Sequence, residues 1–112
     1  MKTIILLSFL YIFNTSNDIK RVSYYGDSHH GKKTASGEIF NMYDMTAAHK
    51  TLKFGTIVEV TSIETNKSVI VRINDRGPYI KGRDFDLSKS AFFKISPKRY
   101  GGSIKVKIKI IK

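Results

Sequence analysis

Cysteine is absent from this chain of 112 residues. A disulfide, a thiolate metal site and a catalytic thiol are therefore excluded, and the folded domain has to rely on its core. Acidic residues are also scarce, because nine Asp and Glu stand against 20 Lys and Arg, for a formal net charge of +11. Such a charge favours an anionic partner, such as a nucleic acid, a membrane lipid or an acidic polysaccharide. Solvated surface lysines alone are the other explanation of the same excess.

The chain also lacks an apolar run long enough to span a bilayer, which takes about 20 residues. Its main apolar run, residues 4–13, is broken by one serine, follows a lysine and precedes a polar stretch. That order is typical of a secretory signal peptide, whereas a buried N-terminal helix is the alternative. We predict a signal peptide over residues 1–17 and a single domain over residues 18–112, with no stable membrane insertion once the signal is removed.

Alternating apolar and polar residues predict three β-strands in the rest of the chain. Two of them, residues 56–63 and 68–73, are joined by a polar link that makes them a hairpin. In the third, residues 104–110, Ile and Val alternate with lysines, which predicts one buried face and one solvated face. An alternative role for these lysines is contact with a nucleic acid or a lipid.

Two short helices are predicted as well. Residues 44–49 could form about one helical turn. A longer helix begins with Asp86 or Ser88 as its N-cap, places Ala91, Phe92 and Ile95 at helical spacing, and ends before a proline. Strands dominate and the helices are short, which predicts a mainly β domain built as a compact barrel.

Four segments carry residues suited to chemistry. Tyr25 follows a second tyrosine and precedes a glycine, where an aromatic face could stack on a sugar ring, although a tyrosine is as often a core residue. Glu38 closes a loop of small hydroxyl residues between two glycines, and a solvated charge is the usual state of such a residue. His49 follows small residues and could orient a carboxylate or a substrate hydroxyl, or be a structural histidine. Asp75 ends a strand, where catalytic groups are often held, although it could also be an ordinary turn aspartate.

His29 and His30 raise the question of a metal site. Two adjacent histidines on a strand point in different directions, and no spaced carboxylate–histidine motif accompanies them. We therefore expect no metal site and no cofactor.

Taken together and in order, these segments closely resemble the core domain of the rare lipoprotein A family. The resemblance covers residues 22–111, nearly the whole predicted domain. It rests on five ordered motifs: Ser-Tyr-Tyr-Gly at 23–26, Thr-Ala-Ser-Gly-Glu-Ile-Phe at 34–40, Thr-Ala-Ala-His through Phe-Gly-Thr at 46–56, Arg-Ile-Asn-Asp-Arg-Gly-Pro at 72–78 and Gly-Arg-Asp-Phe-Asp-Leu-Ser at 82–88.

The resemblance implies a six-stranded double-psi β-barrel with one or two short helices and a groove across it. It implies the activity of a septal-ring-type lytic transglycosylase, which cleaves peptidoglycan glycan strands endolytically and prefers strands without stem peptides. Asp75 matches the candidate catalytic acid, and Glu38 and His49 match positions in the same cleft. We expect substrate contacts from a further set of residues: Tyr25, Thr34, Ser36, Asn74, Arg76, Arg83 and Asp86. Arg72 is a further candidate for gripping the carboxylates of the strand.

A single acid suffices for this chemistry. A glycoside hydrolase normally uses two carboxylates, whereas in a lytic transglycosylase the 6-hydroxyl of the substrate attacks the anomeric carbon, and one residue serves as acid and then as base. The acid has to hold a proton near neutral pH. Arg76, beside Asp75, would oppose this unless its guanidinium points elsewhere, whereas Glu38, if it lies close, would favour it.

The sequence departs from the family in several places. Without cysteine there is no lipid-attachment site, so we expect a protein released into the periplasm or cell envelope and no lipoprotein. We expect no peptidoglycan-binding domain after the barrel, so the sequence does not predict whether the protein is targeted to the division septum. Asn41 stands where some relatives place a second carboxylate, and Lys53 stands where proline is usual.

Two other functions compete with the enzyme. A non-catalytic, expansin-like module would bind cell-wall polysaccharide without breaking bonds, and it would keep its function after Asp75→Asn. A nucleic-acid binder would show salt-sensitive affinity, but the predicted signal peptide and the lack of a recognition motif argue against it. The expected partner is therefore peptidoglycan, with no nucleic acid, and we expect a monomer.

Overall fold

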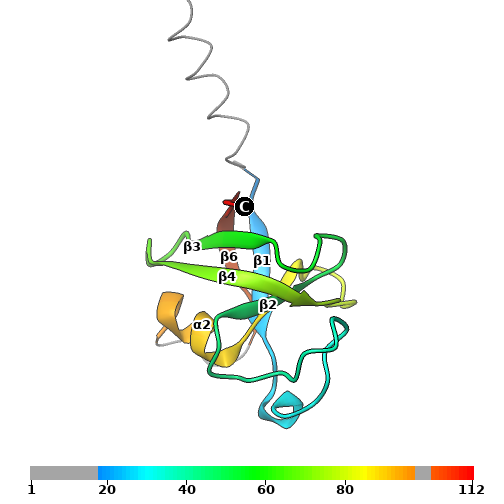
Figure 1. Ribbon diagram of the computed structural model, residues 1–112. Helices are drawn as coiled ribbons and strands as arrows, with labels where there is room; N and C mark the ends of the chain where they lie inside the picture. The colour runs from blue at the N-terminus through cyan, green and yellow to red at the C-terminus, as the bar shows by residue number, and fades with distance from the viewer. Residues whose placement is uncertain (1–17, 98–101) are drawn as a thin grey trace, which may run out of the picture.

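The computed structural model describes residues 18–97 and 102–112. The predicted signal peptide, residues 1–17, lies outside the described residues. Within them, six strands form one closed barrel in the order β1-β5-β2-β4-β3-β6 (Figure 1). The strands are β1 (Lys20–Tyr24), β2 (Thr46–His49), β3 (Ile57–Ser62), β4 (Ser68–Asp75), β5 (Phe85–Leu87) and β6 (Ile104–Ile110).

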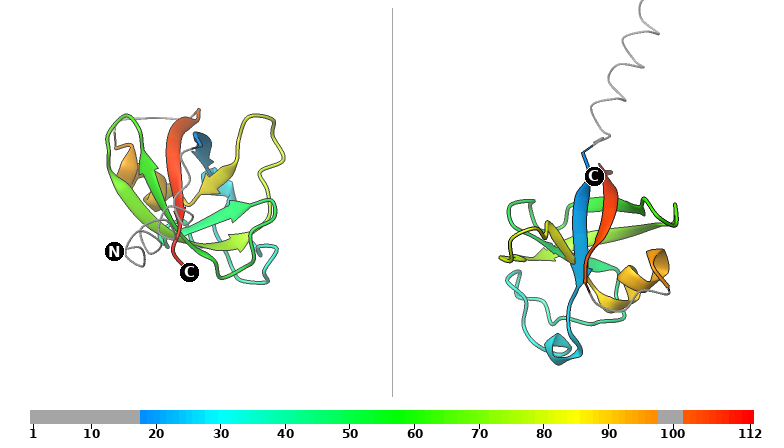
Figure 2. Two further views of the ribbon diagram at one scale, coloured as in Figure 1. Left: turned by 90° about the horizontal axis from the view of Figure 1, so that it is seen from above. Right: turned by 180° about the vertical axis from the view of Figure 1, so that it is seen from behind.

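The pairing is mixed, as expected for a double-psi barrel. The pairs β1–β5 and β2–β4 are parallel, and the other neighbours around the ring are antiparallel. From above, the strands enclose a common centre, and from behind, β1 and β6 run side by side (Figure 2). The predicted six-stranded barrel is confirmed.

The three predicted strands are present as β3, β4 and β6. The apolar side chains of their alternating pattern fill the interior of the barrel, where Val58 and Val60 of β3 and Val106 of β6 are fully buried. The lysines of β6 are exposed, so the predicted solvated face is confirmed. Closure of the barrel leaves β6 paired on both sides, with β1 and β3.

The helix α2 (Lys89–Ile95) confirms the second predicted helix and closes one side of the core. Ser88 is its N-cap, and the Oγ of Ser88 accepts a hydrogen bond from the Ala91 N–H at 3.2 Å. Phe92 and Ile95 are fully buried against the barrel. A short 3-10 helix, η1 (Asp27–His29), follows β1.

The helix predicted over residues 44–49 is wrong. Thr46–His49 form β2, which lies between β4 and β5 and hydrogen-bonds to both. The two alanines of β2 favour a helix by local propensity, but the hydrogen bonds from the two neighbouring strands override that preference. The small size of the alanines serves packing, because Ala47 contacts the main core whereas Ala48 contacts a second cluster that includes Tyr25 and Phe40.

The connection between β1 and β2 lies beyond the barrel, at the end opposite the C-terminus (Figure 1). A β-bridge between Lys33 and Ile39 closes part of this connection into a loop. The loop meets the end of β4, since the Ser36 N–H donates to the Asn74 carbonyl oxygen at 3.3 Å. Two of the sequence motifs, residues 34–40 and 72–78, are therefore brought together at the end of β4.

Candidate functional site

A bulge decides which way Asp75 points. Ala47 of β2 is opposite Ile73, but Ala48 is opposite Asp75, so Asn74 is an extra residue in the β4 ladder. Side chains on a strand alternate between its faces, so a regular strand would place Asp75 on the inner face with the fully buried Ile73. The bulge instead directs Asp75 toward the second cluster, outside the main core.

Three hydrogen bonds hold the Asp75 carboxylate. The backbone N–H groups of Ala35 and Arg76 donate to Oδ1 at 2.8 and 2.9 Å, and the Tyr25 hydroxyl donates to Oδ2 at 2.6 Å. The donors come from the residue just after β4, from the loop after η1 and from the residue just after β1. The backbone donors could not be found from the sequence, because every residue except proline carries the same N–H group.

Thr34 and Ser36 shape the loop that supplies one of these donors. Thr34 Oγ1 donates to the Glu38 carbonyl oxygen at 2.9 Å and lies 2.9 Å from Ser36 Oγ. Gly37, between Ser36 and Glu38, has a φ of 93°, a conformation that favours glycine. Thr34 is buried, so its contacts lie within the loop and hold the backbone around Ala35.

Glu38 belongs to the same loop, and Arg72 neutralises the charge of its carboxylate. The Arg72 guanidinium donates to both carboxylate oxygens, at 2.6 and 2.8 Å, and Asn74 Nδ2 lies 3.4 Å from Oε1. The hydrogen bonds from Arg72 hold the pKa of Glu38 below its usual value. The ion pair therefore keeps Glu38 ionised and places a compensating positive charge beside it.

We expect Glu38→Gln to lower stability at pH 7 but not in acid. Because the pKa of Glu38 is lowered in the folded state, the ion pair gives its full contribution to stability above the ordinary pKa of glutamate, about 4.3. That contribution is lost as the pH falls through the lowered pKa of the folded state. The side chains are 39% and 43% exposed, so the loss at pH 7 is modest, about 0.5–1 kcal/mol. Thermal unfolding from pH 7 to pH 3 measures it, with Glu64→Gln as the matched control. A difference from wild type that stays the same across this range would contradict the prediction.

His49 supports the turn after β2. Its Nδ1 accepts hydrogen bonds from the N–H groups of Thr51 and Leu52, at 3.1 and 2.9 Å, which leaves the proton of the neutral ring on Nε2. The ring lies 4.6 Å from Phe85, and burial is the main cause that lowers the pKa of His49. In the described part of the chain, its side chain makes no hydrogen bond to Asp75 or Glu38. The structure therefore does not join the three predicted catalytic residues into one network.

The Arg76 guanidinium points away from Asp75. It donates to the carbonyl oxygens of His49 and Leu52, at 3.3 and 2.7 Å, and lies 4.0 Å over the Phe54 ring. Of the groups of Arg76, the backbone N–H alone donates to the Asp75 carboxylate. Among the described residues, the Arg76 guanidinium therefore forms no ion pair with Asp75.

Arg83 and Asp86 bind each other. The Arg83 Nη2 donates to Asp86 Oδ1 at 2.5 Å, and both side chains are largely buried. Asp86 is opposite Ala48 in the β2–β5 pair, which places it near the second cluster. The structure therefore gives Arg72, Arg76 and Arg83 partners within the domain, so each would have to exchange or share them to grip a substrate carboxylate.

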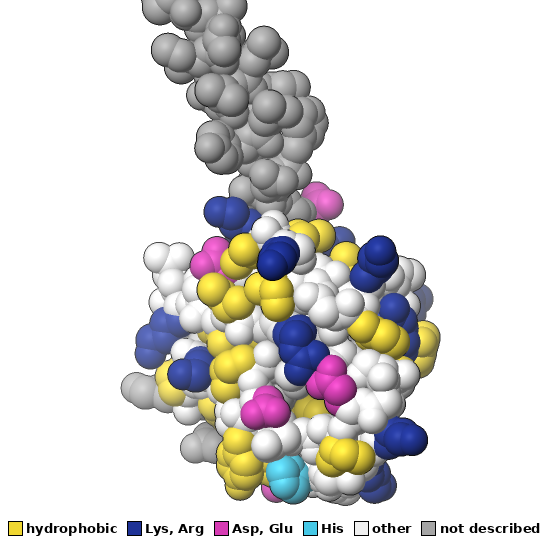
Figure 3. Space-filling model, viewed as in Figure 1, with side chains coloured by type: hydrophobic (Ala, Val, Ile, Leu, Met, Phe, Trp, Pro, Cys, Tyr) yellow, Lys and Arg dark blue, Asp and Glu magenta, His cyan; other side chains and the backbone are white. Residues whose placement is uncertain are grey.

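The face that carries β2 and β4 has a mixed surface. Basic, acidic and apolar side chains are interspersed over it (Figure 3). Several large apolar residues are well exposed in the loops that flank Asp75 and Glu38: Ile39, Tyr43, Phe54, Tyr79 and Ile80. Exposed aromatic rings of this kind are suited to stacking on sugars.

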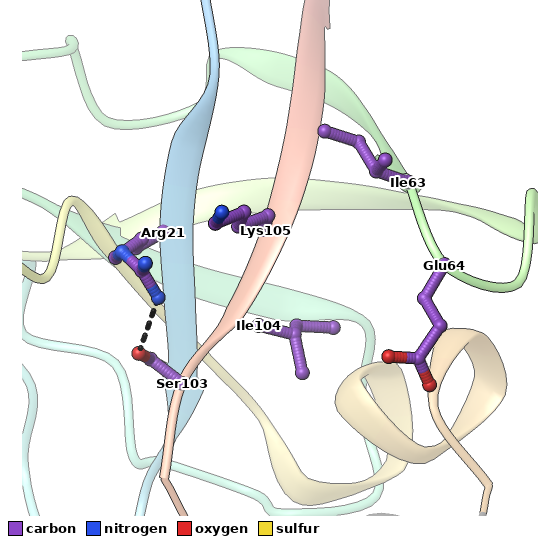
Figure 4. A pocket seen from close by; sticks show the side chains of 6 residues that line it. All are labelled: Arg21, Ile63, Glu64, Ser103, Ile104 and Lys105. Atoms are coloured by element: carbon purple, nitrogen blue, oxygen red, sulfur yellow. Dashed lines mark hydrogen bonds between the residues drawn. The ribbon is translucent and has the colours of Figure 1, made fainter.

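A separate hollow of about 350 Å³ lies between β1, β6 and the link from β3 to β4. Arg21 and Lys105 lie on one side of it and Glu64 on the other (Figure 4). Arg21 already donates to Ser103 Oγ at 3.5 Å. None of the residues that line this hollow takes part in the Asp75 network described above.

Comparison with known proteins identifies the family. The family model for lytic transglycolases of the double-psi β-barrel type matches residues 19–108. This chain belongs to that family. The match covers β1 to β5 completely, β6 as far as Ile108, and every residue of the Asp75 network.

Relatives support the assignment. The chain is 61% identical over 69 residues to the probable endolytic peptidoglycan transglycosylase RlpA of Treponema pallidum, covering 62% of this chain and 22% of the relative. It is 47% identical over 91 residues to the endolytic peptidoglycan transglycosylase RlpA of Vibrio cholerae, covering 81% of this chain and 34% of the relative. The chain thus spans between about a fifth and a third of the length of these relatives.

A solved structure shares the fold. The Streptomyces papain inhibitor superposes with a TM-score of 0.66 at 21% identity, covering 86% of this chain and 96% of the inhibitor.

Among the described residues, no helix is both long and apolar enough to cross a membrane.

Proposed function

We propose that this chain is an endolytic peptidoglycan lytic transglycosylase with Asp75 as its acid and base. The observation that carries the proposal is the fixed Asp75 carboxylate: two backbone N–H groups and a phenol hold it at the end of β4 while the neighbouring guanidinium is directed elsewhere. Membership of the lytic transglycolase family and the peptidoglycan transglycosylase names of the relatives support the same activity.

The reaction requires one group that both gives and takes a proton. Protonated Asp75 donates its proton to the glycosidic oxygen as the bond from that oxygen to the anomeric carbon breaks. The 6-hydroxyl of the same muramic acid residue attacks the anomeric carbon and gives its proton to the Asp75 carboxylate. The products are a 1,6-anhydromuramic acid end and a new free hydroxyl, no water is consumed, and Asp75 recovers its starting state.

The charge of the domain suits the substrate. A glycan strand without stem peptides carries a free lactyl carboxylate on each muramic acid residue, so it is a polyanion that a protein with a formal net charge of +11 attracts. Exposed aromatic residues such as Tyr79, at 76% exposure, provide faces for sugar rings. A peptidoglycan enzyme works in the cell envelope, which agrees with the signal peptide predicted over residues 1–17.

Product analysis tests the proposal. The chain without residues 1–17 is incubated with glycan strands stripped of stem peptides by an amidase, and the soluble products are identified by mass spectrometry. We expect products with 1,6-anhydromuramic acid ends and internal cleavage of long strands. Products with ordinary reducing ends would mean hydrolysis and a second carboxylate. Binding of the strands without products would make the domain a non-catalytic polysaccharide-binding module.

A further inference from the structure

Tyr25 is the only side chain among the described residues that hydrogen-bonds to the Asp75 carboxylate. Tyr25 is 8% exposed; its ring stacks on Phe40 with centroids 4.3 Å apart and makes an edge contact with the His29 ring, with centroids 5.2 Å apart. These contacts leave no open ring face of useful size for a sugar. The position of Tyr25 therefore does not favour the role predicted from the sequence, which was stacking on the substrate.

The hydrogen bonds make the two oxygens of Asp75 unequal. A carboxylate oxygen accepts about two in-plane hydrogen bonds, and the N–H groups of Ala35 and Arg76 fill both places on Oδ1. These backbone groups can only donate, so Oδ1 is held as an acceptor. Within residues 18–97 and 102–112, Oδ2 accepts from Tyr25 alone, which leaves one of its two places open. A transferred proton therefore has to enter and leave through Oδ2.

The surroundings of Tyr25 keep its hydroxyl protonated. Burial is the largest cause that raises the pKa of Tyr25, followed by the hydrogen bond to Asp75 and the negative charges of Asp75 and Asp86. Arg83 pairs with Asp86 and offsets part of that charge, and His29 contacts the Tyr25 ring from η1. The phenol is thus a constant donor rather than an acid that competes with Asp75.

We propose that Tyr25 is the positioning residue of the proton transfer: its hydroxyl selects Oδ2 of Asp75 as the reacting oxygen and stabilises the carboxylate formed when the proton leaves. This inference rests on the proposed transglycosylase function. During bond cleavage the negative charge grows on Asp75, and the Tyr25 hydrogen bond strengthens with it. When the 6-hydroxyl returns a proton to Oδ2, the same hydroxyl keeps that oxygen in place.

The test is Tyr25→Phe, which removes one hydroxyl and keeps the ring stacked on Phe40. The matched control is Tyr24→Phe, because the Tyr24 ring packs instead against Phe92 and Phe93. We expect Tyr25→Phe to lower kcat about 10- to 100-fold with little change in KM, since hydrogen bonds to charged groups are among the stronger ones. Loss of a donor to the ionised form should also move the limb of the pH–rate profile that reports Asp75 to higher pH. The control should change neither kcat nor the profile.

A second readout does not depend on activity. The 13C signal of the Asp75 carboxyl carbon, followed by NMR through an acid titration, should show its midpoint at higher pH in Tyr25→Phe than in wild type and Tyr24→Phe. An unchanged midpoint together with an unchanged pH–rate profile would overturn the inference while leaving the transglycosylase function standing. Wild-type protein that yields no anhydro products would instead defeat the proposed function, and the titration would still report whether Tyr25 controls the ionisation of Asp75.

Discussion

Asp75→Asn is expected to abolish the formation of 1,6-anhydromuramic acid ends, with a fall in rate of about 10²- to 10⁴-fold. Asparagine has nearly the same shape as aspartate, and its amide oxygen can still accept the N–H groups of Ala35 and Arg76. The amide can neither give a proton to the glycosidic oxygen nor take one from the 6-hydroxyl. The rate of release of anhydro ends from peptide-free strands, read by mass spectrometry, measures the effect.

The matched control for that experiment is Glu64→Gln, which makes the same change from carboxylate to amide in the link between β3 and β4. It should retain wild-type activity. Asp75→Asn should still bind glycan strands in a pull-down and keep a wild-type thermal transition, which separates lost chemistry from lost folding. Full activity of Asp75→Asn would place the catalytic acid on another residue.

Phe92→Ala should destabilise the fold far more than Glu38→Gln or Asp75→Asn. Phe92 is fully buried, contacts the Tyr24 ring at 4.7 Å and fills the space between α2 and the barrel. Truncating a buried phenylalanine costs about 3–5 kcal/mol, a large part of the total of about 5–15 kcal/mol for a domain. Thermal unfolding should therefore show a midpoint at least about 12 °C lower.

Lys94→Ala is the control on the same helix, because Lys94 is exposed and its replacement should change stability by less than about 0.5 kcal/mol. Phe92→Leu should be intermediate, since it restores most of the buried volume. A loss for Phe92→Ala no greater than that for Lys94→Ala would mean that α2 does not close the core as the structure shows.

The strands of the barrel were predictable where the alternation was clean. In β6, Val106 and its apolar neighbours alternate with lysines, and this pattern is itself the cause of one buried and one solvated face. The α2 helix was predictable for a similar reason, since Ser88 is an N-cap and Phe92 and Ile95 recur at helical spacing. The family was predictable from the sequence as well, because its motifs follow one another in order along the chain.

The conformation of Thr46–His49 was not predictable from local sequence. A short segment with two alanines favours a helix by local propensity, and it forms β2 because β4 and β5 supply hydrogen bonds on both sides. The arginines near Asp75 show the same limit. Arg72 and Arg76 differ by four positions, yet one binds the Glu38 carboxylate and the other binds two carbonyl oxygens of a distant turn.

The sequence by itself determined that the chain forms a mainly β domain and that an aspartate ends one of its central strands. Only the tertiary structure decided what that aspartate can do. The extra residue Asn74 in the β4 ladder turns Asp75 out of the core, and loops distant in sequence bring the Ala35 N–H and the Tyr25 hydroxyl to its two oxygens. The physical reason is that alternation and caps act between near neighbours, whereas register, charge compensation and hydrogen-bond donors are set by residues that meet only when the barrel closes.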